Sequence, residues 1–466
     1  PNLPFKQKGV STIMILHNSL SEKSEQQSFS RSFSQLKVNQ HLRSAGIKKA
    51  FGCSAKDVFQ IIFQLVFLGK NWFRLLNSDR KNDLPGKDTV YRFLNYGRYA
   101  WRKFLHSISL SMVQSFDKLT SSSRVKVFIV DDSFLQRNRS KKAELLARLY
   151  DHASHRFMKG YNMLTLGWSD GFSFLPIDFT MLSSAKQSNR LCEMKEDLDK
   201  RTHGYKRRQE ALTKKPDALV QMVTNALNTG FSADYILMDS WFTQAPLLRK
   251  LVEKEVHVIG MVKELKQRYL YKGQKLSLQE LFDKTPKNRK VSIIGSILVQ
   301  TSCGLPLKIV FVQNRNNRRE WLAILSTDIG LEDSEIVRIY GMRWSIETFF
   351  KFAKSYLKLG TEFQGRSFDM LISHTSIVFT RYLILEWERR NNCDDRTFGG
   401  LFYLFCDEVR DMDLKTALQH LMVFILTILD KRPKNEKTTI LCQLNNWISC
   451  LPNYIKDLLV NWSCES

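Results

Sequence analysis

The first 120 residues space their apolar positions as helices do. From residue 54 apolar side chains recur every three or four positions: Val58, Ile61, Ile62, Leu65 and Val66. Ser54 is the expected N-terminal cap of this helix, and a turn at 82–86 precedes a short helix at 87–94 with a basic exposed face. The region is either a helix-turn-helix-like reader of DNA or an ordinary helical bundle. Residues 1–35, rich in Ser, Gln and Lys, are expected to be partly disordered.

From residue 125 onward short apolar runs replace the helical spacing. Residues 125–130 predict a strand that ends at Asp131-Asp132-Ser133, and residues 235–238 predict another that ends at Asp239. Between them Asp170-Gly171 predicts a hairpin turn that joins two strands. The basic stretch 184–215 is either a loop or an exposed helix. The remaining expected elements are strands at 163–168, 172–179 and 256–262 and helices at 218–227 and 244–254.

The second half of the chain has two different sequence patterns. Residues 263–329 contain short β-rich segments, at 291–300, 307–313 and 321–326, and are interpreted as a β-rich insertion in the central domain. From residue 332 the pattern is helical almost to the end, with breaks at 391–400 and 431–437. The chain therefore predicts an α/β fold flanked by helical N- and C-terminal regions.

The charge balance predicts a polyanionic partner. The 466 residues include 71 Lys and Arg against 46 Asp and Glu, a net charge of +25. Nucleic acid is the usual partner, because each neutralised phosphate releases condensed counterions, and an anionic membrane surface is the alternative. No apolar run of about 20 residues predicts a membrane-spanning helix. The eight cysteines form no CxxC pair, which argues against a zinc site and suits a reducing cytoplasm.

Two aspartates follow the short apolar strands. Asp131 and Asp239 would meet in a crevice if their strands are neighbours, because polar side chains emerge at strand ends in α/β sheets. Mg²⁺ prefers such hard oxygen ligands, and two ions held by three carboxylates can cleave a phosphodiester. The alternative for each aspartate is a structural role as a helix cap or turn former. Asp132 is the other candidate for the first ligand.

A helix over residues 340–354 offers the third carboxylate. At about 100° per residue its two faces differ in character. The polar face carries Tyr340, Arg343, Glu347 and Lys354, and the apolar face carries Ile346, Phe349, Phe352, Ala353 and Tyr356. The polar face suits a metal ligand beside phosphate-binding groups. The alternative, which periodicity alone favours, is a salt-bridged face where Glu347 pairs with Arg343 or Lys351.

The spacing of these polar residues matches a known signature. Tyr340, Arg343, Glu347 and Lys354, with two, three and six residues between them, resemble the signature of the bacterial insertion-sequence-four family of DDE transposases. Trp344 is also typical. Other blocks are similar to family members: Asp131-Asp132-Ser133, Leu237-Met238-Asp239-Ser240-Trp241-Phe242, Tyr150-Asp151-His152 through Gly160, and Leu164-Thr165-Leu166-Gly167-Trp168. The resemblance covers residues 87 to about 360.

The resemblance implies a ribonuclease-H-like catalytic core. Asp131, Asp239 and Glu347 would be the catalytic triad and would hold two Mg²⁺ ions, for which Mn²⁺ can substitute. Trp321 would stack on a base flipped out of the transposon end, and a core position is its alternative. The phosphates near that base would contact three further residues: Tyr340, Arg343 and Lys354.

The implied organisation has five parts. A helical DNA-binding region precedes the first part of the core, a β-rich insertion domain and the core helix with the catalytic Glu follow, and a helical region for dimerisation or DNA contact ends the chain. Their expected bounds are residues 1–120, 121–262, 263–329, 330–365 and 366–466.

The implied activity is cut-and-paste transposition. Each transposon end is nicked by hydrolysis, the freed 3′-hydroxyl attacks the opposite strand to form a hairpin, a second hydrolysis opens it, and the end joins target DNA. The implied partners are double-stranded DNA, as terminal inverted repeats and target, and a second copy of the chain. The implied location is the bacterial cytoplasm at the nucleoid, away from membranes. The alternatives are a metal-dependent nuclease on the same core and a domesticated DNA-binding protein without catalysis.

Overall fold

A computed structural model describes residues 28–451, apart from residues 79–80, 83, 122, 152–153, 288–291, 315–316, 318 and 392–396. The disorder expected for residues 1–27 and the centre of the break at 391–400 lie outside the described residues. Residues 28–35, the last part of the stretch expected to be partly disordered, form helix α2 (Ser28–Gln35).

The chain divides into two compact units. The first consists of Pro1–Gln35, Gln64–Pro85 and Gly399–Ser466, and the second of Leu36–Phe63 and Gly86–Phe398. The helices of the first unit are α2, α5 (Trp72–Leu76), most of α15 (Phe398–Leu429) and α16 (Lys434–Cys450). These helices confirm the helical pattern predicted near the C-terminus. The break predicted at 431–437 is shorter than expected, because α16 already begins at Lys434.

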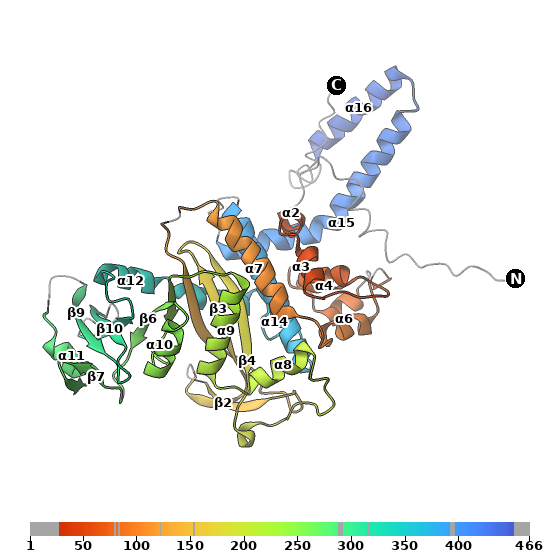
Figure 1. The fold of residues 1–466 in the computed structure, drawn as a ribbon. Helices are drawn as coiled ribbons and strands as arrows, with labels where there is room; N and C mark the ends of the chain where they lie inside the picture. Colours follow the sequence, from red (N-terminus) through yellow and green to blue (C-terminus); the bar gives the residue numbers. More distant parts are fainter. Residues whose placement is uncertain are drawn as a thin grey trace. The chain divides into compact units, whose positions relative to one another are not determined.

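The second unit is built on one mixed sheet (Figure 1). Its described strands run in the order β2-β3-β1-β5-β6-β11-β10-β9-β7-β8, and β4 also pairs with β3. The strand bounds are β1 (Val127–Gln136), β2 (Ala147–Asp151), β3 (Arg156–Ser169), β4 (Phe174–Leu182), β5 (Tyr235–Met238), β6 (His257–Val262), β7 (Tyr269–Tyr271), β8 (Gln274–Leu276), β9 (Ile293–Gln300), β10 (Pro306–Gln313) and β11 (Trp321–Ser326).

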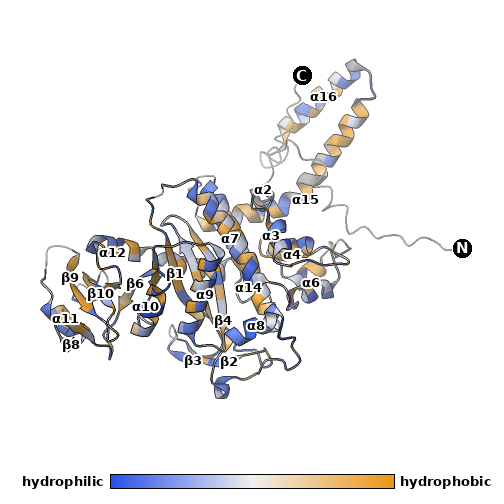
Figure 2. Ribbon diagram, viewed as in Figure 1, coloured by the Kyte–Doolittle hydropathy of each residue, from blue (hydrophilic) through white to orange (hydrophobic). Residues whose placement is uncertain are grey.

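The central strands combine a hairpin with a parallel pair. β3 and β4 are antiparallel around the predicted turn, where Gly171 has a φ of 85° that disfavours other residues. β1 is antiparallel to β3 and parallel to β5, which is parallel to β6. The apolar residues of β1 and β4 are buried, and Figure 2 shows the apolar character of these central strands. This part of the sheet is therefore covered on both faces.

One expectation about the strands needs correction. β1 continues to Gln136, so Asp131 lies within the strand and not at its end. The reason is that β1 keeps pairing with β3 as far as Gln136, whereas its pairing with β5 stops at Ile129. The strands of residues 263–329 also extend the same sheet, because β11 pairs with β6 in antiparallel fashion.

Helices cover both faces of this sheet. α7 and α9 pack on β4, and α13 packs on β1 and β4. The basic stretch 184–215 contains helix α8, which includes the buried Arg207 and Arg208, so it is not simply an exposed segment. The helix bounds are α3 (Val38–Ser44), α4 (Ala55–Gln64), α6 (Lys87–Leu94), α7 (Trp101–Asp117), α8 (His203–Ala211), α9 (Lys215–Thr229), α10 (Ala245–Val252), α11 (Leu278–Lys284), α12 (Asp333–Gly341), α13 (Trp344–Ser355) and α14 (Phe368–Asn391), with a 3₁₀ turn η3 (Gln187–Asn189).

α14 is a core helix of the second unit. It contacts β4, α7 and α13, and most of its residues are buried. Its Arg381 donates to the carbonyl oxygen of Phe63 at 3.0 Å and to that of Leu357 at 3.1 Å, and pairs with Glu362 at 2.9 Å. Because Leu357 and Glu362 follow α13, Arg381 anchors the end of that helix. None of the helices described combines the length and the apolar character that a membrane span requires.

Candidate active site on the central strands

Asp131 and Asp239 lie next to each other on neighbouring strands. β1 and β5 pair in parallel with Val127 opposite Tyr235 and Ile129 opposite Leu237. The pairing ends there, and its register directs Asp131 and Asp239, which directly follows β5, toward the same part of the sheet. The charge of Asp239 accordingly acts on Asp131. The strand order therefore brings together two acids that the sequence separates widely.

Asp131 and Asp132 face opposite sides of the sheet, as neighbours on a strand must. Oδ2 of Asp131 lies 3.3 Å from Nη1 of Arg343, just before α13. Oδ2 of Asp132 lies 2.9 Å from Nζ of Lys215, the first residue of α9. The face toward α13 is thus occupied by Asp131, and the face toward α9 by Asp132.

Glu347 approaches the same face from α13. The segment 340–354 is not one helix, as its periodicity predicted: α12 ends at Gly341 and α13 begins at Trp344. A tight turn joins them, in which the amide of Arg343 donates to the carbonyl oxygen of Tyr340 at 3.0 Å. The turn keeps Arg343 in helical conformation, so Arg343 and Glu347 still share one face.

Arg343 bridges two of the three acids. Its guanidinium donates to Oε1 of Glu347 with one nitrogen and contacts Asp131 with another. The pair that periodicity alone favoured is therefore present, and it sits against Asp131. The side chains of Arg343, Asp131 and Glu347 are 16, 19 and 34% exposed, so solvent reaches the cluster from the Glu347 side.

The surroundings hold an excess of negative charge. Burial raises the pKa of Asp131 to about 7, and the charges of Asp132 and Asp239 add to the rise, although Arg343 and the amide of Asp132 oppose it. Burial also raises the pKa of Tyr340 to about 12, opposed by Arg343 and assisted by Asp239. Tyr340, Asp131 and Glu347 offset the effect of burial on Arg343 and leave its pKa above the usual value. One guanidinium therefore does not neutralise the site completely.

Lys215 and Trp241 support the site and were not singled out from the sequence. The ammonium of Lys215 lies 4.2 Å from the ring centroid of Trp241 while it pairs with Asp132. The amide of Trp241 in turn donates to Oδ1 of Asp239 at 2.8 Å. Lys215 thus ties β1 to the loop that carries Asp239. Sequence gives no signal for this contact, because Lys215 and Asp132 are 83 residues apart.

Lys354 and Trp321 lie away from the acids. Lys354 is seven residues beyond Glu347 on α13, about 10 Å along the axis. Burial lowers the pKa of Lys354, and the charge of Asp151 at the end of β2 opposes that effect. Trp321 begins β11 at the same sheet edge as Asp239, two strands away. It stacks on Phe282 with ring centroids 4.6 Å apart and remains partly exposed.

The acids suit a divalent metal by their chemistry. Asp131, Asp239 and Glu347 offer the hard carboxylate oxygens that Mg²⁺ and Mn²⁺ prefer, in surroundings with uncompensated negative charge. Within the described part of the chain, however, no three His, Cys, Asp or Glu side chains are already gathered as one ligand set. Arg343 holds Asp131 and Glu347 instead, so metal binding requires that arginine to release them.

Two protein-family models match the chain across this site. The model described as DDE superfamily endonuclease matches residues 82–274, which include Asp131 and Asp239. The model described as Transposase DDE domain matches residues 197–383, which include Asp239 and Glu347. These matches support a DDE transposase. DDE transposases are enzymes of nuclease type that generally use a divalent metal and act on DNA. The search of curated proteins gave no match.

Proposed function

We propose that the chain is a DNA transposase of the insertion-sequence-four family, which moves an insertion sequence by cut-and-paste through a hairpin intermediate. The observation that carries the proposal is the approach of Asp131, Asp239 and Glu347 to one face of the central strands. The matches to endonuclease and transposase families agree with it. The spacing of Tyr340, Arg343, Glu347 and Lys354 supplies the family.

The proposed core is ribonuclease-H-like. Its support is the strand order β4-β3-β1-β5-β6, with an antiparallel first part and a parallel second part. In this interpretation residues 121–262 and 330–365 form the core, and 263–329 are the insertion domain. The flanking regions 1–120 and 366–466 would contribute DNA contacts and dimerisation.

The three acids would share the metal. Asp131, Asp239 and Glu347 would hold two Mg²⁺ ions, which promote attack by an oxygen nucleophile on phosphorus and stabilise the leaving oxygen. Arg343 would turn from Asp131 and Glu347 toward a DNA phosphate, because a planar guanidinium binds phosphate as well as carboxylate. Asp132 would stay on the other face with Lys215.

The other polar groups would hold the DNA end. Tyr340 and Lys354 would contact phosphates, and Trp321 would stack on the extruded base, which is worth about 1–3 kcal/mol per base. The partly exposed ring of Trp321 supports that role, although it must then exchange or share its stacking on Phe282. The same acids would serve both hydrolytic steps, hairpin formation and joining, since all are in-line phosphoryl transfers.

The partners would be DNA and a second copy of the chain. Two transposon ends would be held by a homodimer in the bacterial cytoplasm, at the nucleoid. The net charge of +25 supports a polyanionic partner.

Substitution of the acids tests the proposal. With Mg²⁺ and DNA that carries the inverted repeats flanking the coding sequence, Asp131→Asn, Asp239→Asn and Glu347→Gln are each expected to lower cleavage and joining at least about 1000-fold, since each removes a metal ligand. End binding should persist. Glu335→Gln, which changes an exposed acid of α12, is the control and should cleave normally.

The same assay separates the alternatives. Cleavage by the unmodified protein without joined product would indicate a nuclease, and binding without cleavage would indicate a domesticated DNA-binding protein. Normal turnover by any of the three acid variants would remove that residue from the triad. If Asp132→Asn lost all activity while Asp131→Asn kept it, the first ligand would be Asp132.

A further inference from the structure

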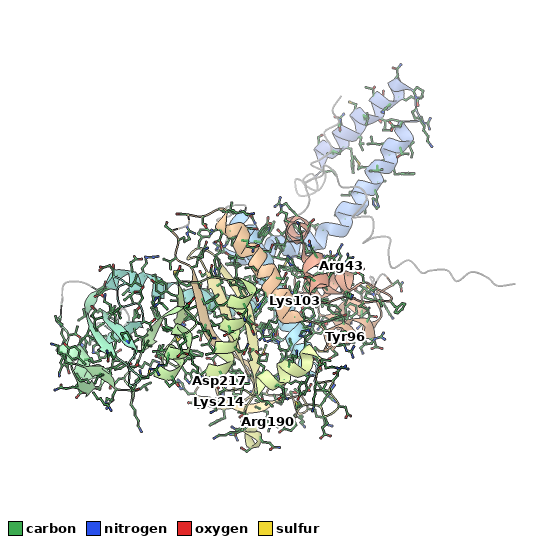
Figure 3. The ribbon with its side chains drawn as sticks, viewed as in Figure 1. Arg43, Tyr96, Lys103, Arg190, Lys214 and Asp217 are labelled. Atoms are coloured by element: carbon green, nitrogen blue, oxygen red, sulfur yellow. The ribbon has the colours of Figure 1, made fainter. Side chains whose placement is uncertain are left out.

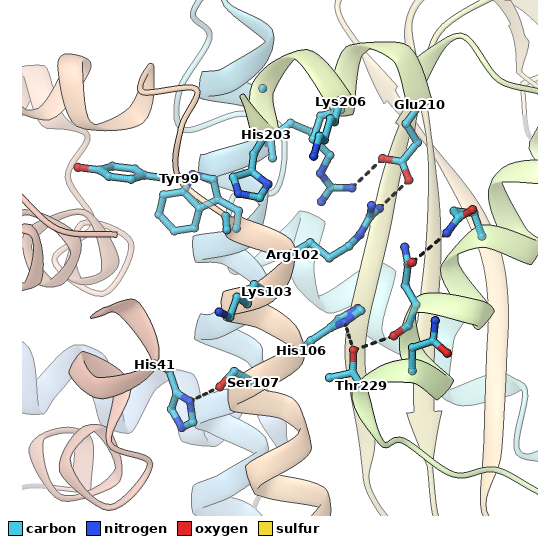
Figure 4. Close-up of a pocket in the computed structure, with 18 of the residues that line it drawn as sticks. His41, Tyr99, Arg102, Lys103, His106, Ser107, His203, Lys206, Glu210 and Thr229 are labelled. Carbon is cyan, nitrogen blue, oxygen red and sulfur yellow. Dashed lines mark hydrogen bonds and ion pairs between the residues drawn. The ribbon is translucent and has the colours of Figure 1, made fainter. Parts of the chain in front are cut away.

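A hollow with charged and amide side chains in its lining lies in the same unit, away from Asp131, Asp239 and Glu347. It has a volume of about 1250 Å³ and is bordered by α3, α7, α8 and α9 (Figure 4). Lys103 and Ser107 line it from α7, and Lys206 lines it from α8. On the α3 side, Nδ1 of His41 lies 2.6 Å from Oγ of Ser107, which links that helix to α7. No step of the proposed reaction uses these residues.

The hollow opens on the sheet face opposite Glu347. α9 begins with Lys215, which meets Asp132, whereas α13 meets Asp131. Because adjacent residues of β1 point to opposite faces, α9 and α13 lie on opposite sides of that strand. The hollow follows α9 from Asp217 to Thr229, and Figure 3 marks Lys214 and Asp217 at the start of this helix and Lys103 on α7.

The acids that line the hollow are already paired with cations. Glu210 binds Arg102 at 2.7 Å, Asp217 binds Lys250 at 2.9 Å, and Asp369 binds Arg208 at 2.8 Å. Three exposed lysines of the lining have no such partner: among the described residues, no carboxylate lies within ion-pair distance of Lys37, Lys103 or Lys206. The hollow therefore carries uncompensated positive charge.

The positive charges converge from different elements. Partial burial lowers the pKa of His203, and the nearby charges of Lys206, Arg207 and Lys103 lower it further. Lys103 and Lys206, from α7 and α8, thus act on one imidazole between them. The pKa of His41 is likewise lowered by burial and by Lys37. The charges of Lys103 and Lys206 therefore lie near each other in the hollow, and Lys37 adds positive charge beside His41.

One wall adds hydrogen-bonding amides. α9 presents Gln221, Asn225 and Asn228, which fall on one helix face by their spacing. Nε2 of Gln221 donates to Oδ1 of Asn225 at 2.9 Å, so these amides are organised along the wall. From Asp217 to Thr229 the wall is about 18 Å long, which corresponds to about five base pairs along the duplex axis at about 3.4 Å each.

We propose that this hollow binds the sugar-phosphate backbone of one strand of duplex DNA, in addition to the DNA held at the carboxylates. The inference rests on the proposed action on DNA. Lys37, Lys103 and Lys206 neutralise phosphates, and the amides and hydroxyls of the wall donate to phosphate oxygens. A surface with spare positive charge and hydrogen-bonding side chains fits a phosphodiester chain, which repeats its charge at regular intervals.

Neutralising two lysines of the hollow tests the proposal. The double variant Lys103→Gln/Lys206→Gln of the full chain is compared with Lys118→Gln/Lys254→Gln, which removes the same charge from exposed residues outside the hollow. Duplex DNA binding is measured in EDTA over a range of salt. The slope of log Kd against log salt should be about 1.8 lower in the hollow variant than in the unmodified protein, because each of the two lost phosphate contacts removes about 0.9. The control pair should leave the slope unchanged.

A labelling experiment locates the contact directly. Duplex DNA should protect Lys103 and Lys206 from amine acylation by at least about threefold and leave Lys118 and Lys254 reactive, because bound phosphates cover the amines. Equal salt slopes in the two double variants, or acylation of Lys103 and Lys206 that DNA does not change, would overturn the hollow as a DNA surface. If either result is obtained and the unmodified protein still cleaves and joins DNA, only this inference fails. If the unmodified protein binds no DNA, the proposed function fails with it.

Discussion

At the scale of single residues, the crowding of carboxylates around Asp131 favours the binding of a cation. Asp131 is largely buried beside two other carboxylates, and Arg343 is its nearest positive charge. Such an arrangement lowers the stability of the folded protein when every acid is ionised. Such a loss of folding stability is common at sites that bind a charged ligand, because the bound ligand neutralises the excess charge.

The pKa of Asp131 predicts how this cost depends on pH. Since that pKa is about 7 in the folded protein against 3.8 for the free group, Asp131 stabilises the fold only while protonated. That contribution is complete below about pH 4 and is lost as pH rises toward 7. Asp131→Asn cannot ionise, so it should gain about 1–3 kcal/mol over the unmodified protein between pH 4 and pH 8.

Denaturant unfolding in EDTA at several pH values measures the difference. Asp283→Asn, at an exposed position of α11, is the control and should show no such trend. A free energy of unfolding for Asp131→Asn that falls relative to the unmodified protein as pH rises would show that ionised Asp131 stabilises the fold, which would contradict the raised pKa.

At the scale of elements, local patterns predicted much of the site and long-range contacts did not. The apolar runs before Asp131 and Asp239 predicted β1 and β5, because a buried strand is a continuous run of apolar residues in the sequence. The spacing of polar residues also predicted the helix face that carries Glu347. The turn that separates α12 from α13 was not predicted, because Met342 and Arg343 keep helical angles and interrupt no spacing.

Contacts between distant segments had no such local signal. The pairing of β11 with β6, which makes the insertion part of the main sheet, depends on complementary edges that periodicity does not specify. The Lys215 contact with Asp132 and Trp241 likewise joins three separate elements. The hollow is lined by residues from several helices, and the sequence of no single helix predicts it.

The contact of Lys215 predicts a positioning role. Lys215→Met should leave Asp132 without its cation and loosen the loop of Asp239, with a loss of about 1–2 kcal/mol in stability and about tenfold in cleavage rate. Lys215→Arg should restore most of the rate, because a guanidinium can also bind a carboxylate and lie over an indole ring.

Single-turnover cleavage at saturating DNA, together with denaturant unfolding, measures both effects. Lys214→Met, at the exposed neighbouring lysine, is the matched control and should change neither. If Lys215→Met lost stability but cleaved at the normal rate, Lys215 would be a structural residue only. A positioning role requires the rate to fall and the arginine variant to recover it.

At the scale of the whole molecule, positive charge is distributed over more than one surface. The chain has a net charge of +25, and many of its basic residues are paired, such as Arg208 with Glu144 and Arg381 with Glu362. Those buried pairs hold the fold and are not open to DNA. Among the described residues, the lysines of the hollow form one surface where positive charge remains available.

This distribution predicts a steep salt dependence of DNA binding. If the unmodified protein contacts six or more phosphates, its affinity for duplex DNA should fall about 1000-fold or more between 50 and 200 mM salt, because each contact releases counterions. DNA with and without the inverted repeats should show similar slopes, since phosphate contacts carry no sequence information, and the repeats should differ only in overall affinity. Fluorescence anisotropy in EDTA measures both slopes without cleavage. A flat response would mean that phosphate contacts contribute little to binding, and the positive charge would then need an explanation other than DNA.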